Sequence, residues 1–338
     1  MSGEISSEQE ALLRSLEAAF PDPYGPVCSW MNSRPLNEAL RLVHYTSFEA
    51  LEKILRNKTL RFSPLARLND KNELREGKRL LRDYLLDSQS RIRKAILSLG
   101  SVDDSLCDEI WMSFEDSIPY EHHYSFISCW SMCTTAKETY DNLAMWRGYA
   151  SDGNGVAITL DPLKFGFPLK RSEIAFWPVQ YEQPNEFEQR VFESISSFVD
   201  VIRQQSELVS TNSHWIICRL FSDLCFHLAI THKHPGFKAE RECRFVWTSD
   251  SLRESSLSRY MKPVAVAGSY LNYFDMPIKS NQAISPKPLS IQSLITAVMI
   301  GPCKNQEFVK LAVDELLRDI GHQHLFLQTC PTPYRSVS

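Results

Sequence analysis

A ten-residue segment in the last third of the chain constrains the fold more than any other. Residues 238–247 read KAERECRFVW, and on an extended strand the alternation places Glu240, Glu242 and Arg244 on one face. The other face takes Arg241, Cys243, Phe245 and Trp247. Two adjacent carboxylates repel each other, and Arg244 compensates only one of them well. The segment therefore predicts a strand with a core face and a chemically active face; a solvated strand face with an ion pair is the alternative.

Composition sets the class of protein. Of 338 residues, 43% are hydrophobic and 23% charged, which is the balance of a globular protein with a sizeable core. The formal net charge of -4 gives no overall reason to bind nucleic acid or an anionic membrane, so such a partner requires a local basic patch. The first residues are acidic and polar, unlike a secretory signal, and no apolar run is long enough to span a bilayer. We therefore expect a cytoplasmic protein with no membrane partner.

Cysteine spacing argues against disulfides and zinc. The chain has nine cysteines, an odd number, and contains no C-x-x-C pair, which predicts reduced thiols. Cys129 and Cys133 lie near His122 and His123, but their spacing matches no standard ligand pattern. We expect no metal site.

Short strands and helices follow one another irregularly. We predict a helical and loop appendage over residues 1–40 and a single elaborated domain over 41–338. Predicted strands cover 41–45, 59–63, 124–131, 156–160, 174–181 and the segment from Glu240, with later strands near Val264, Ala297 and Leu325. Helical spacing covers 48–57, 74–99, 138–150, 186–210, 214–232 and 305–320. A tight turn is expected at 152–155, because Asn and Gly tolerate positive φ. This order predicts an α+β fold with a mixed, largely antiparallel sheet of short strands and inserted helices.

Four sequence blocks occur in a specific order between residues 42 and 330. They are His44-Tyr45-Thr46 with Leu60 to Ser63, Asn69-Asp70 with Glu73, Ser125 to Ser128 with Met145 to Ala150 and Gly155, and Glu240-x-Glu242-x-Arg244. Ile300-Gly301-Pro302 follows near the end. In these blocks the chain resembles a bacterial family catalogued as domain of unknown function 2971. One position departs from the family pattern, because Lys71 follows Asp70 where the family usually has proline.

A weaker likeness concerns the fold of ADP-ribosyltransferases. It rests on a histidine at the end of a first strand, a capped helix, a central helix with aromatic residues, and a late strand with glutamate. These enzymes cleave the nicotinamide-ribose bond of NAD through an oxocarbenium-like transition state, which requires a carboxylate near the ribose and polar and aromatic groups around the dinucleotide. The likeness implies NAD as substrate and transfer of ADP-ribose to an unknown protein or nucleic-acid acceptor by a bacterial toxin or defence effector.

The same likeness implies a role for each catalytic candidate. Glu242 would stabilise the positive charge that develops on the nicotinamide ribose, and Glu240 would orient or activate the acceptor. Arg244 would hold the two carboxylates in register. The two glutamates are interchangeable in this hypothesis.

The expected NAD-binding residues lie elsewhere in the chain. They are His44, Tyr45, Asn69, Trp146 and Tyr149. His44 would bind the adenosine-side ribose with support from Tyr45, and an aromatic ring of Trp146 or Tyr149 would stack on the ligand. The structural alternatives are a histidine bonded to backbone, packed aromatic residues, and a side-chain-capped turn at Asn69. The hypothesis requires His44 and Glu242 to face one nucleotide-sized cavity.

Three alternatives remain open. One is a module that binds a nucleotide or a protein segment without chemistry. Another is an Mg²⁺-dependent nuclease or hydrolase, whose oxygen ligands would be Asp70, Glu73, Glu240 and Glu242. The last is a Cys129 nucleophile paired with His122 or His123.

Overall fold

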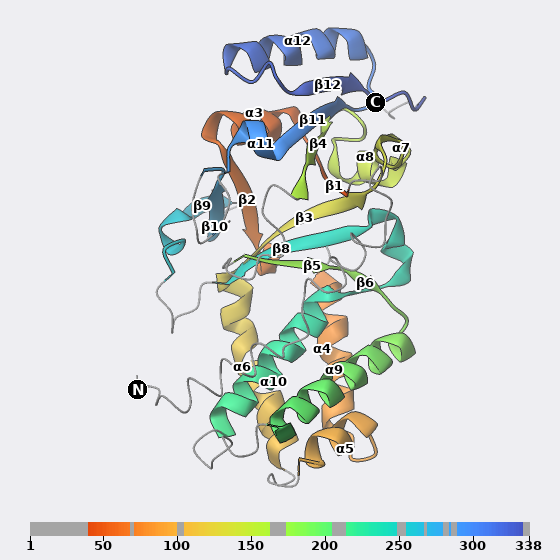
Figure 1. The fold of residues 1–338 in the computed structure, drawn as a ribbon, viewed down its shortest axis with the longest axis vertical. Coiled ribbons are helices and arrows are strands. Elements are labelled where there is room, and N and C mark those ends of the chain that lie inside the picture. The colour runs from red at the N-terminus through yellow and green to blue at the C-terminus, as the bar shows by residue number, and fades with distance from the viewer. Residues whose placement is uncertain are drawn as a thin grey trace. The chain divides into compact units, whose positions relative to one another are not determined.

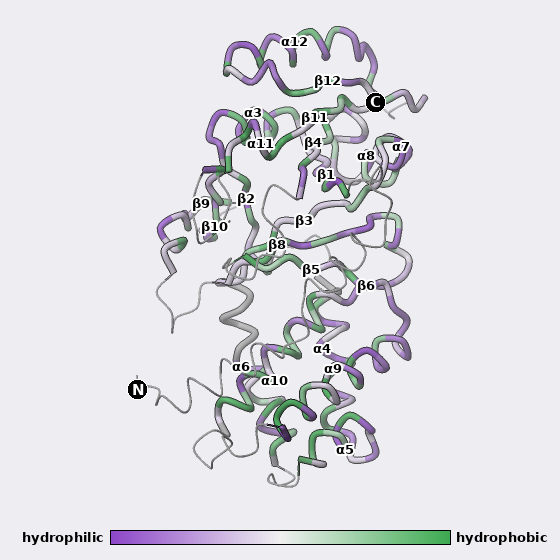
Figure 2. Tube along the Cα trace, viewed as in Figure 1, coloured by the Kyte–Doolittle hydropathy of each residue, from purple (hydrophilic) through white to green (hydrophobic). Residues whose placement is uncertain are grey.

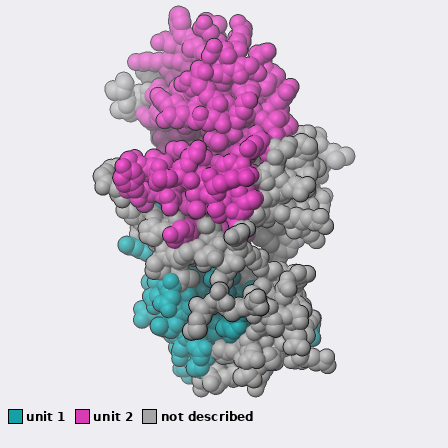
Figure 3. Space-filling view, turned by 90° about the vertical axis from the view of Figure 1, so that its left-hand side faces the viewer, with its two compact units in different colours: residues 1–25, 66–122, 179–236 teal, residues 26–65, 123–178, 237–338 magenta. Residues whose placement is uncertain are grey.

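The described part of the chain forms two compact units. The computed structural model describes residues 40–67, 71–99, 105–162, 174–204, 214–248, 255–266, 269–279, 284 and 289–333 (Figure 1). The described residues of the first unit lie within 66–122 and 179–236, and those of the second within 40–65, 123–178 and 237–333 (Figure 3). Residues 41–338, expected as one domain, are thus divided between two units. The chain passes between them several times, so no single linker marks a boundary in the sequence.

The first unit is mainly helical. Its helices are α4 (Lys71–Leu86), α5 (Arg91–Leu97), most of α6 (Ser105–Tyr124), α9 (Pro184–Gln204) and α10 (His214–Thr231), and β6 (Gln180–Tyr181) pairs in parallel with β7 (His232–Lys233). Apolar and polar residues alternate along α9 (Figure 2), and six of its apolar residues between Phe187 and Ile202 are buried. The helix expected over 74–99 is broken after Leu86, and Ser90 caps α5 by accepting a hydrogen bond from the Ile92 N–H.

A polar network ties the start of α9 to the end of α10. Arg190 donates from Nε and Nη2 to the two carboxylate oxygens of Glu182 at 2.7 and 2.9 Å, and from Nη1 to the Thr231 hydroxyl at 3.2 Å. The ring of His232 stacks on Phe187 with centroids 4.3 Å apart. Burial raises the pKa of Glu182, but hydrogen bonds from His232 and Arg190 outweigh it and hold this pKa below its ordinary value. The carboxylate is therefore an anchor for the guanidinium.

The second unit contains a ten-stranded sheet. Its strands are β1 (Arg41–Thr46), β2 (Thr59–Pro64), β3 (Ser125–Cys133), β4 (Val156–Leu160), β5 (Ala175–Pro178), β8 (Glu242–Thr248), β9 (Met261–Val266), β10 (Ser269–Pro277), β11 (Ile295–Ile300) and β12 (Phe326–Thr329). The order is β12-β11-β4-β1-β3-β2-β10-β9, and β8 joins β3 to β5. Within these described strands only β11 and β12 run parallel. The predicted α+β class with a mixed, mostly antiparallel sheet is confirmed.

Helices and short turns connect these strands. They are α3 (Phe48–Asn57), α7 (Ala136–Tyr140), α8 (Leu143–Tyr149), α11 (Ile291–Leu294) and α12 (Gln306–Asp319), with 3₁₀ turns η1 (Leu65–Arg67), η4 (Pro235–Glu240) and η5 (Ser258–Tyr260). The helix expected over 138–150 is divided into α7 and α8, because Asn142 caps α8 by accepting from the Met145 N–H. Strand β10 was not predicted. Among the described residues, no helix combines the length and apolar character needed to cross a membrane.

Strand β3 branches the sheet. Along one edge, residues 131–133 of β3 pair with β1, and the last pair joins Ser131 to Val43. Residues 126–127 on the same edge pair with β2, where Ile127 lies opposite Ser63. Along its other edge it pairs with β8. Cys129 lies between the two pairings on the first edge, so β1 and β2 leave a gap in the sheet at this position.

The two faces of this sheet differ in character. Strand register places a set of large aromatic rings on one face, where they contact one another. The set comprises Phe62, Phe126, Trp130, Phe245, Trp247 and Phe274. The other face carries Val43 and Tyr45, which pack against Met145 and Trp146 of α8. The same register places Glu242 and Arg244 on this second face.

The turn before β4 is tightly packed. Ser151, Asp152 and Gly153 have φ values of 50°, 53° and 82°, which confirms the predicted turn. A Cβ atom on Gly155 would lie 2.3 Å from the Thr46 carbonyl oxygen. This glycine is therefore required by the close approach of β1.

Substitution of Gly155 tests this contact. We expect Gly155→Ala to lower the free energy of unfolding by about 1–3 kcal/mol, because the added methyl meets rigid backbone. The matched control is Gly148→Ala in α8, where nothing lies within 4 Å of the added Cβ. There we expect a gain of about 0.5–1 kcal/mol from helix propensity. Urea denaturation of both variants measures the difference, and equal stabilities would contradict the packing.

Candidate functional site

His44 occupies the gap in the sheet. Its Nδ1 lies 3.1 Å from the carbonyl oxygen of Cys129, and its ring lies 4.9 Å from that of Trp130. A carbonyl oxygen only accepts, so Nδ1 carries the proton and Nε2 keeps its lone pair. Burial lowers the pKa of His44, outweighing the hydrogen bond to Cys129. His44 is therefore a neutral imidazole whose Nε2 is a hydrogen-bond acceptor.

Glu242 and Arg244 form a buried ion pair. They are 6% and 2% exposed, and they lie two residues apart on the same face of β8. Arg244 donates from Nε and Nη2 to the two carboxylate oxygens of Glu242 at 2.8 and 3.1 Å. Their expected location on one strand face is confirmed. The guanidinium occupies both oxygens of this carboxylate, which makes the pair a structural anchor.

Glu240 is separated from this pair by a turn in the backbone. Strand β8 begins at Glu242, and Arg241 has a φ of 48°, so alternation does not carry Glu240 onto the strand face. The expected alignment of Glu240 with Glu242 is wrong for this reason. Instead the half-buried Glu240 accepts a hydrogen bond of 3.1 Å from the hydroxyl of Tyr149 in α8. Arg241 pairs with Glu138 at 2.7 Å.

Tyr45 and Trp146 belong to the core. Tyr45 is 3% exposed and donates from its hydroxyl to the Thr139 carbonyl oxygen at 2.7 Å. Its ring meets that of Trp146 edge-on at 5.0 Å, and Trp146 is fully buried. Burial raises the pKa of the Tyr45 phenol. The packing interpretation therefore fits both residues better than ligand contact.

His44 and Glu242 lie on opposite faces of the sheet. Val43 is opposite Ser131, and Ser131 is opposite Glu242, so these three side chains share a face. His44 follows Val43 and points to the aromatic face, in agreement with its contact to Trp130. The two residues do not meet in one site as the hypothesis required.

Several other predicted site residues or their side chains lie outside the part of the chain that the structure describes. Asn69 and Asp70 lie outside the described residues, as do the side chains of Glu73, His122 and His123. Among the residues that the structure does describe, no three His, Cys, Asp or Glu side chains gather as a metal ion requires. The described cysteines form no disulfide.

Two residues beside the buried pair were not singled out from the sequence. In the sheet, Trp177 of β5 lies opposite Arg244, and Ser131 of β3 lies opposite Glu242. The Ser131 hydroxyl is buried and has no hydrogen-bond partner among the described residues. Their proximity to the buried pair cannot be predicted from spacing in the sequence, because it arises from the pairing of β3 and β5 with β8.

Comparison with known proteins identifies one family. The model of a family described as "Protein of unknown function (DUF2971)" matches residues 145–245, a segment that includes most of α8 and the start of β8. This match confirms the resemblance to that family. No curated protein and no solved structure matches the chain. The comparisons therefore give no support to the weaker likeness to ADP-ribosyltransferases.

Stability should depend on pH through His44. The folded imidazole has a pKa below the ordinary value of 6.5, so the unfolded chain binds more protons once the pH falls below about 6.5. Stability contributed by neutral His44 is complete above that pH and is lost as the pH falls. His44→Asn keeps a donor near Nδ1 and should flatten the decline between pH 7 and 5. Thermal unfolding at each pH measures this decline, and His234→Asn, at an exposed histidine, is the control. Identical dependence of stability on pH for His44→Asn and wild type would contradict the assignment.

The buried ion pair should be strongly coupled. We expect Arg244→Met to cost about 3–5 kcal/mol of stability, because it leaves the buried Glu242 carboxylate without its main cation. The double variant Glu242→Gln/Arg244→Met should lose less than this single variant. The exposed pair of Arg79 and Glu76 provides a control, and Arg79→Met should cost less than about 1 kcal/mol. Chemical denaturation measures all three, and a double variant that loses more stability than Arg244→Met alone would contradict the coupling.

Proposed function

We propose that the protein binds NAD, cleaves its nicotinamide-ribose bond and transfers ADP-ribose to a protein or nucleic-acid acceptor. The observation that carries this proposal is the state of His44. Its Nδ1 is held by a backbone carbonyl, its ring is kept neutral by burial, and its Nε2 is an acceptor at a gap in the sheet. A ribose hydroxyl donates a hydrogen bond to such a nitrogen. We assign His44 to the adenosine-side ribose.

The carboxylate of the reaction is Glu240 in this proposal. Glu242 is already bound through both oxygens by Arg244, whereas Glu240 is half-buried and oriented by the Tyr149 hydroxyl. In the proposed step the bond between ribose C1′ and the nicotinamide nitrogen breaks, and its electron pair leaves with nicotinamide. Glu240 stabilises the positive charge on the ribose and takes the proton of the acceptor group that bonds to C1′.

The buried pair then has a positioning role. Glu242 and Arg244 fix the start of β8 directly after the turn at Arg241, and this turn directs Glu240 toward α8. A dinucleotide has two riboses, so His44 and Glu240 need not contact the same sugar. This revised assignment is compatible with the location of His44 and Glu242 on opposite faces of the sheet.

A cytoplasmic location in a bacterium is part of the proposal. The described cysteines form no disulfide, as expected in a reducing compartment, and burial raises the pKa of the Cys133 thiol to about 11. NAD and macromolecular acceptors are both present there. A toxin or defence effector would act on such acceptors.

A second candidate is binding without chemistry. The closed pair of Glu242 and Arg244 and the location of His44 on the opposite face favour it, because the carboxylates of the described strands, Glu242 and Asp275, lie on the face of the sheet away from the imidazole. In that case the protein would recognise a nucleotide or a protein segment and release it unchanged.

Release of nicotinamide distinguishes the two candidates. The purified protein is incubated with NAD labelled in nicotinamide, with and without cell extract as a source of acceptors, and calorimetry measures binding. We expect Glu240→Gln to reduce release by about 100-fold or more while NAD still binds, because it removes the stabilising charge. His44→Asn should weaken NAD binding.

Matched variants complete this experiment. Glu307→Gln changes an exposed carboxylate on α12 and should leave both measurements unchanged. Binding without release in the wild type would select the second candidate. Absence of both binding and release, with and without extract, would overturn the NAD proposal.

A further inference from the structure

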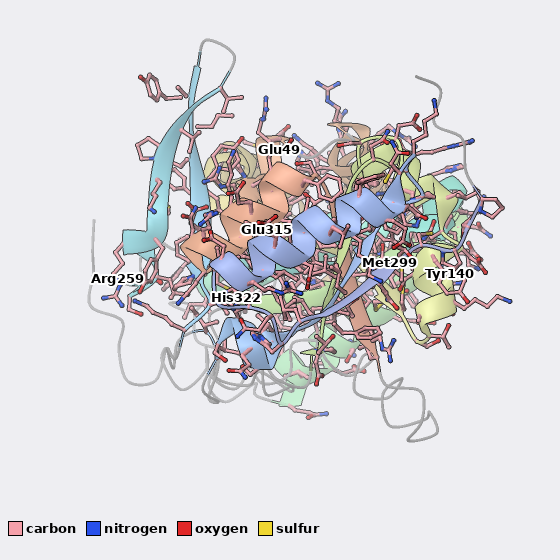
Figure 4. All side chains as sticks on the ribbon, turned by 90° about the horizontal axis from the view of Figure 1, so that it is seen from above. Glu49, Tyr140, Arg259, Met299, Glu315 and His322 are labelled. Carbon is pink, nitrogen blue, oxygen red and sulfur yellow. The ribbon has the colours of Figure 1, made fainter. Side chains whose placement is uncertain are left out.

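Strands β9 and β10 form a projecting ribbon. Residues 274–277 of β10 pair with β2, whereas among the described strands 269–273 pair only with β9. Continued past Phe62, the same register places Tyr273 and Asn272 beside Ser63 and Pro64, so residues 269–271 lie beyond the end of β2. Seen from above, the two strands form a narrow arm at the margin of the sheet, with Arg259 at its base (Figure 4).

Cations predominate on the ribbon and its base. Described residues at this location contribute four cations, Arg61, Arg259, Lys262 and Lys279, against one carboxylate, Asp275. The side chains of Arg61 and Lys262 are 50% and 61% exposed, and that of Asp275 is 9% exposed. Arg61 donates to both Asp275 oxygens at 2.8 and 3.0 Å. The one acid is therefore neutralised internally, and the surface stays basic on a chain with a net charge of -4.

Three of these cations lie over tyrosine rings. Arg259 and Lys279 lie over the ring of Tyr260 at 5.0 and 5.5 Å, and Arg61 lies over Tyr273 at 5.2 Å. Tyr270, on the projecting part of β10, is 77% exposed, the highest exposure among the described large hydrophobic residues. A large ring exposed on a two-stranded arm contributes little to the core, so its value to the fold is small.

We infer that the β9–β10 ribbon binds single-stranded nucleic acid. Lysine and arginine side chains neutralise phosphates, and the exposed ring of Tyr270 provides a surface on which a base stacks without regard to sequence. The register places Tyr270 on the face of the ribbon opposite Lys262 and Arg61, so a strand that passes around the two-stranded ribbon meets both the cations and the ring. An apolar partner does not suit a surface with four cations, and an anionic membrane offers no bases to Tyr270. This binding is separate from NAD chemistry, and the residues of the proposed NAD site play no part in it.

Fluorescence anisotropy with labelled 20-nucleotide RNA and DNA of mixed sequence tests the inference on the full chain. We expect binding that weakens as salt rises. Arg259→Glu/Lys279→Glu should reduce affinity about tenfold or more and lower the slope of log K against log salt by about 1.4, since each phosphate contact contributes about 0.7. Lys53→Glu/Lys304→Glu reverses two exposed charges elsewhere and is the matched control.

Base stacking is tested separately. Tyr270→Ser should weaken oligonucleotide binding about fivefold or more, given the usual contribution of one stacked base. The same variant should leave binding to inorganic polyphosphate unchanged, because that polymer has no bases. Phe308→Ser, at a residue that is 75% exposed on α12, is the matched control for loss of a surface ring.

Four outcomes overturn the inference. They are no oligonucleotide binding at low salt, equal effects of the ribbon and control charge reversals, an unchanged affinity in Tyr270→Ser, and polyphosphate or anionic vesicles bound as tightly as oligonucleotides. Circular dichroism confirms that each variant is folded. A difference between the affinities for RNA and DNA would show which sugar the ribbon prefers.

Discussion

The branching of strand β3 is the constraint on which the second unit depends. One strand pairs with β1 and β2 in succession along one edge and with β8 along the other. Such a branch leaves a backbone carbonyl at Cys129 between two partners, and a buried carbonyl without a hydrogen bond is costly. The His44 imidazole supplies that hydrogen bond. The most distinctive side chain of the candidate site is thus also a component of the sheet, and its neutral state follows from that position.

Burial decides which polar side chains remain available for chemistry. Glu242 and Arg244 share a strand face as their spacing demands, but low exposure and a two-point contact convert them into an anchor. Glu240, displaced by the left-handed backbone at Arg241, stays half-buried beside Tyr149. A single backbone angle therefore separates two glutamates that look equivalent in the sequence. The left-handed region costs free energy at a non-glycine residue, so the surrounding contacts must hold this turn in place.

Charge is distributed unevenly in this unit. Near α8, acids and cations neutralise one another, as in the contact of Arg241 with Glu138. On the β9–β10 ribbon the cations outnumber the acids, and tyrosines lie between them. An overall net charge conceals such a difference, because it sums residues that never approach each other. The proposed NAD site and the inferred nucleic-acid surface consequently use different parts of the same sheet.

The sequence by itself determined the local elements and the fold class. Periodic apolar residues located most helices and strands, and the turn at 152–155 followed from its glycines and asparagine. Tertiary structure alone decided the division into two units and the start of β8 at Glu242. The breaks at Ser90 and Asn142 come from local caps, which a reading of apolar periodicity alone overlooks. It also placed His44 opposite Glu242 across the sheet and buried Tyr45 and Trp146. Local periodicity shows which side of its own helix or strand a residue occupies. Whether two distant residues share a face depends on strand order and register. Contacts between segments far apart in the chain set both.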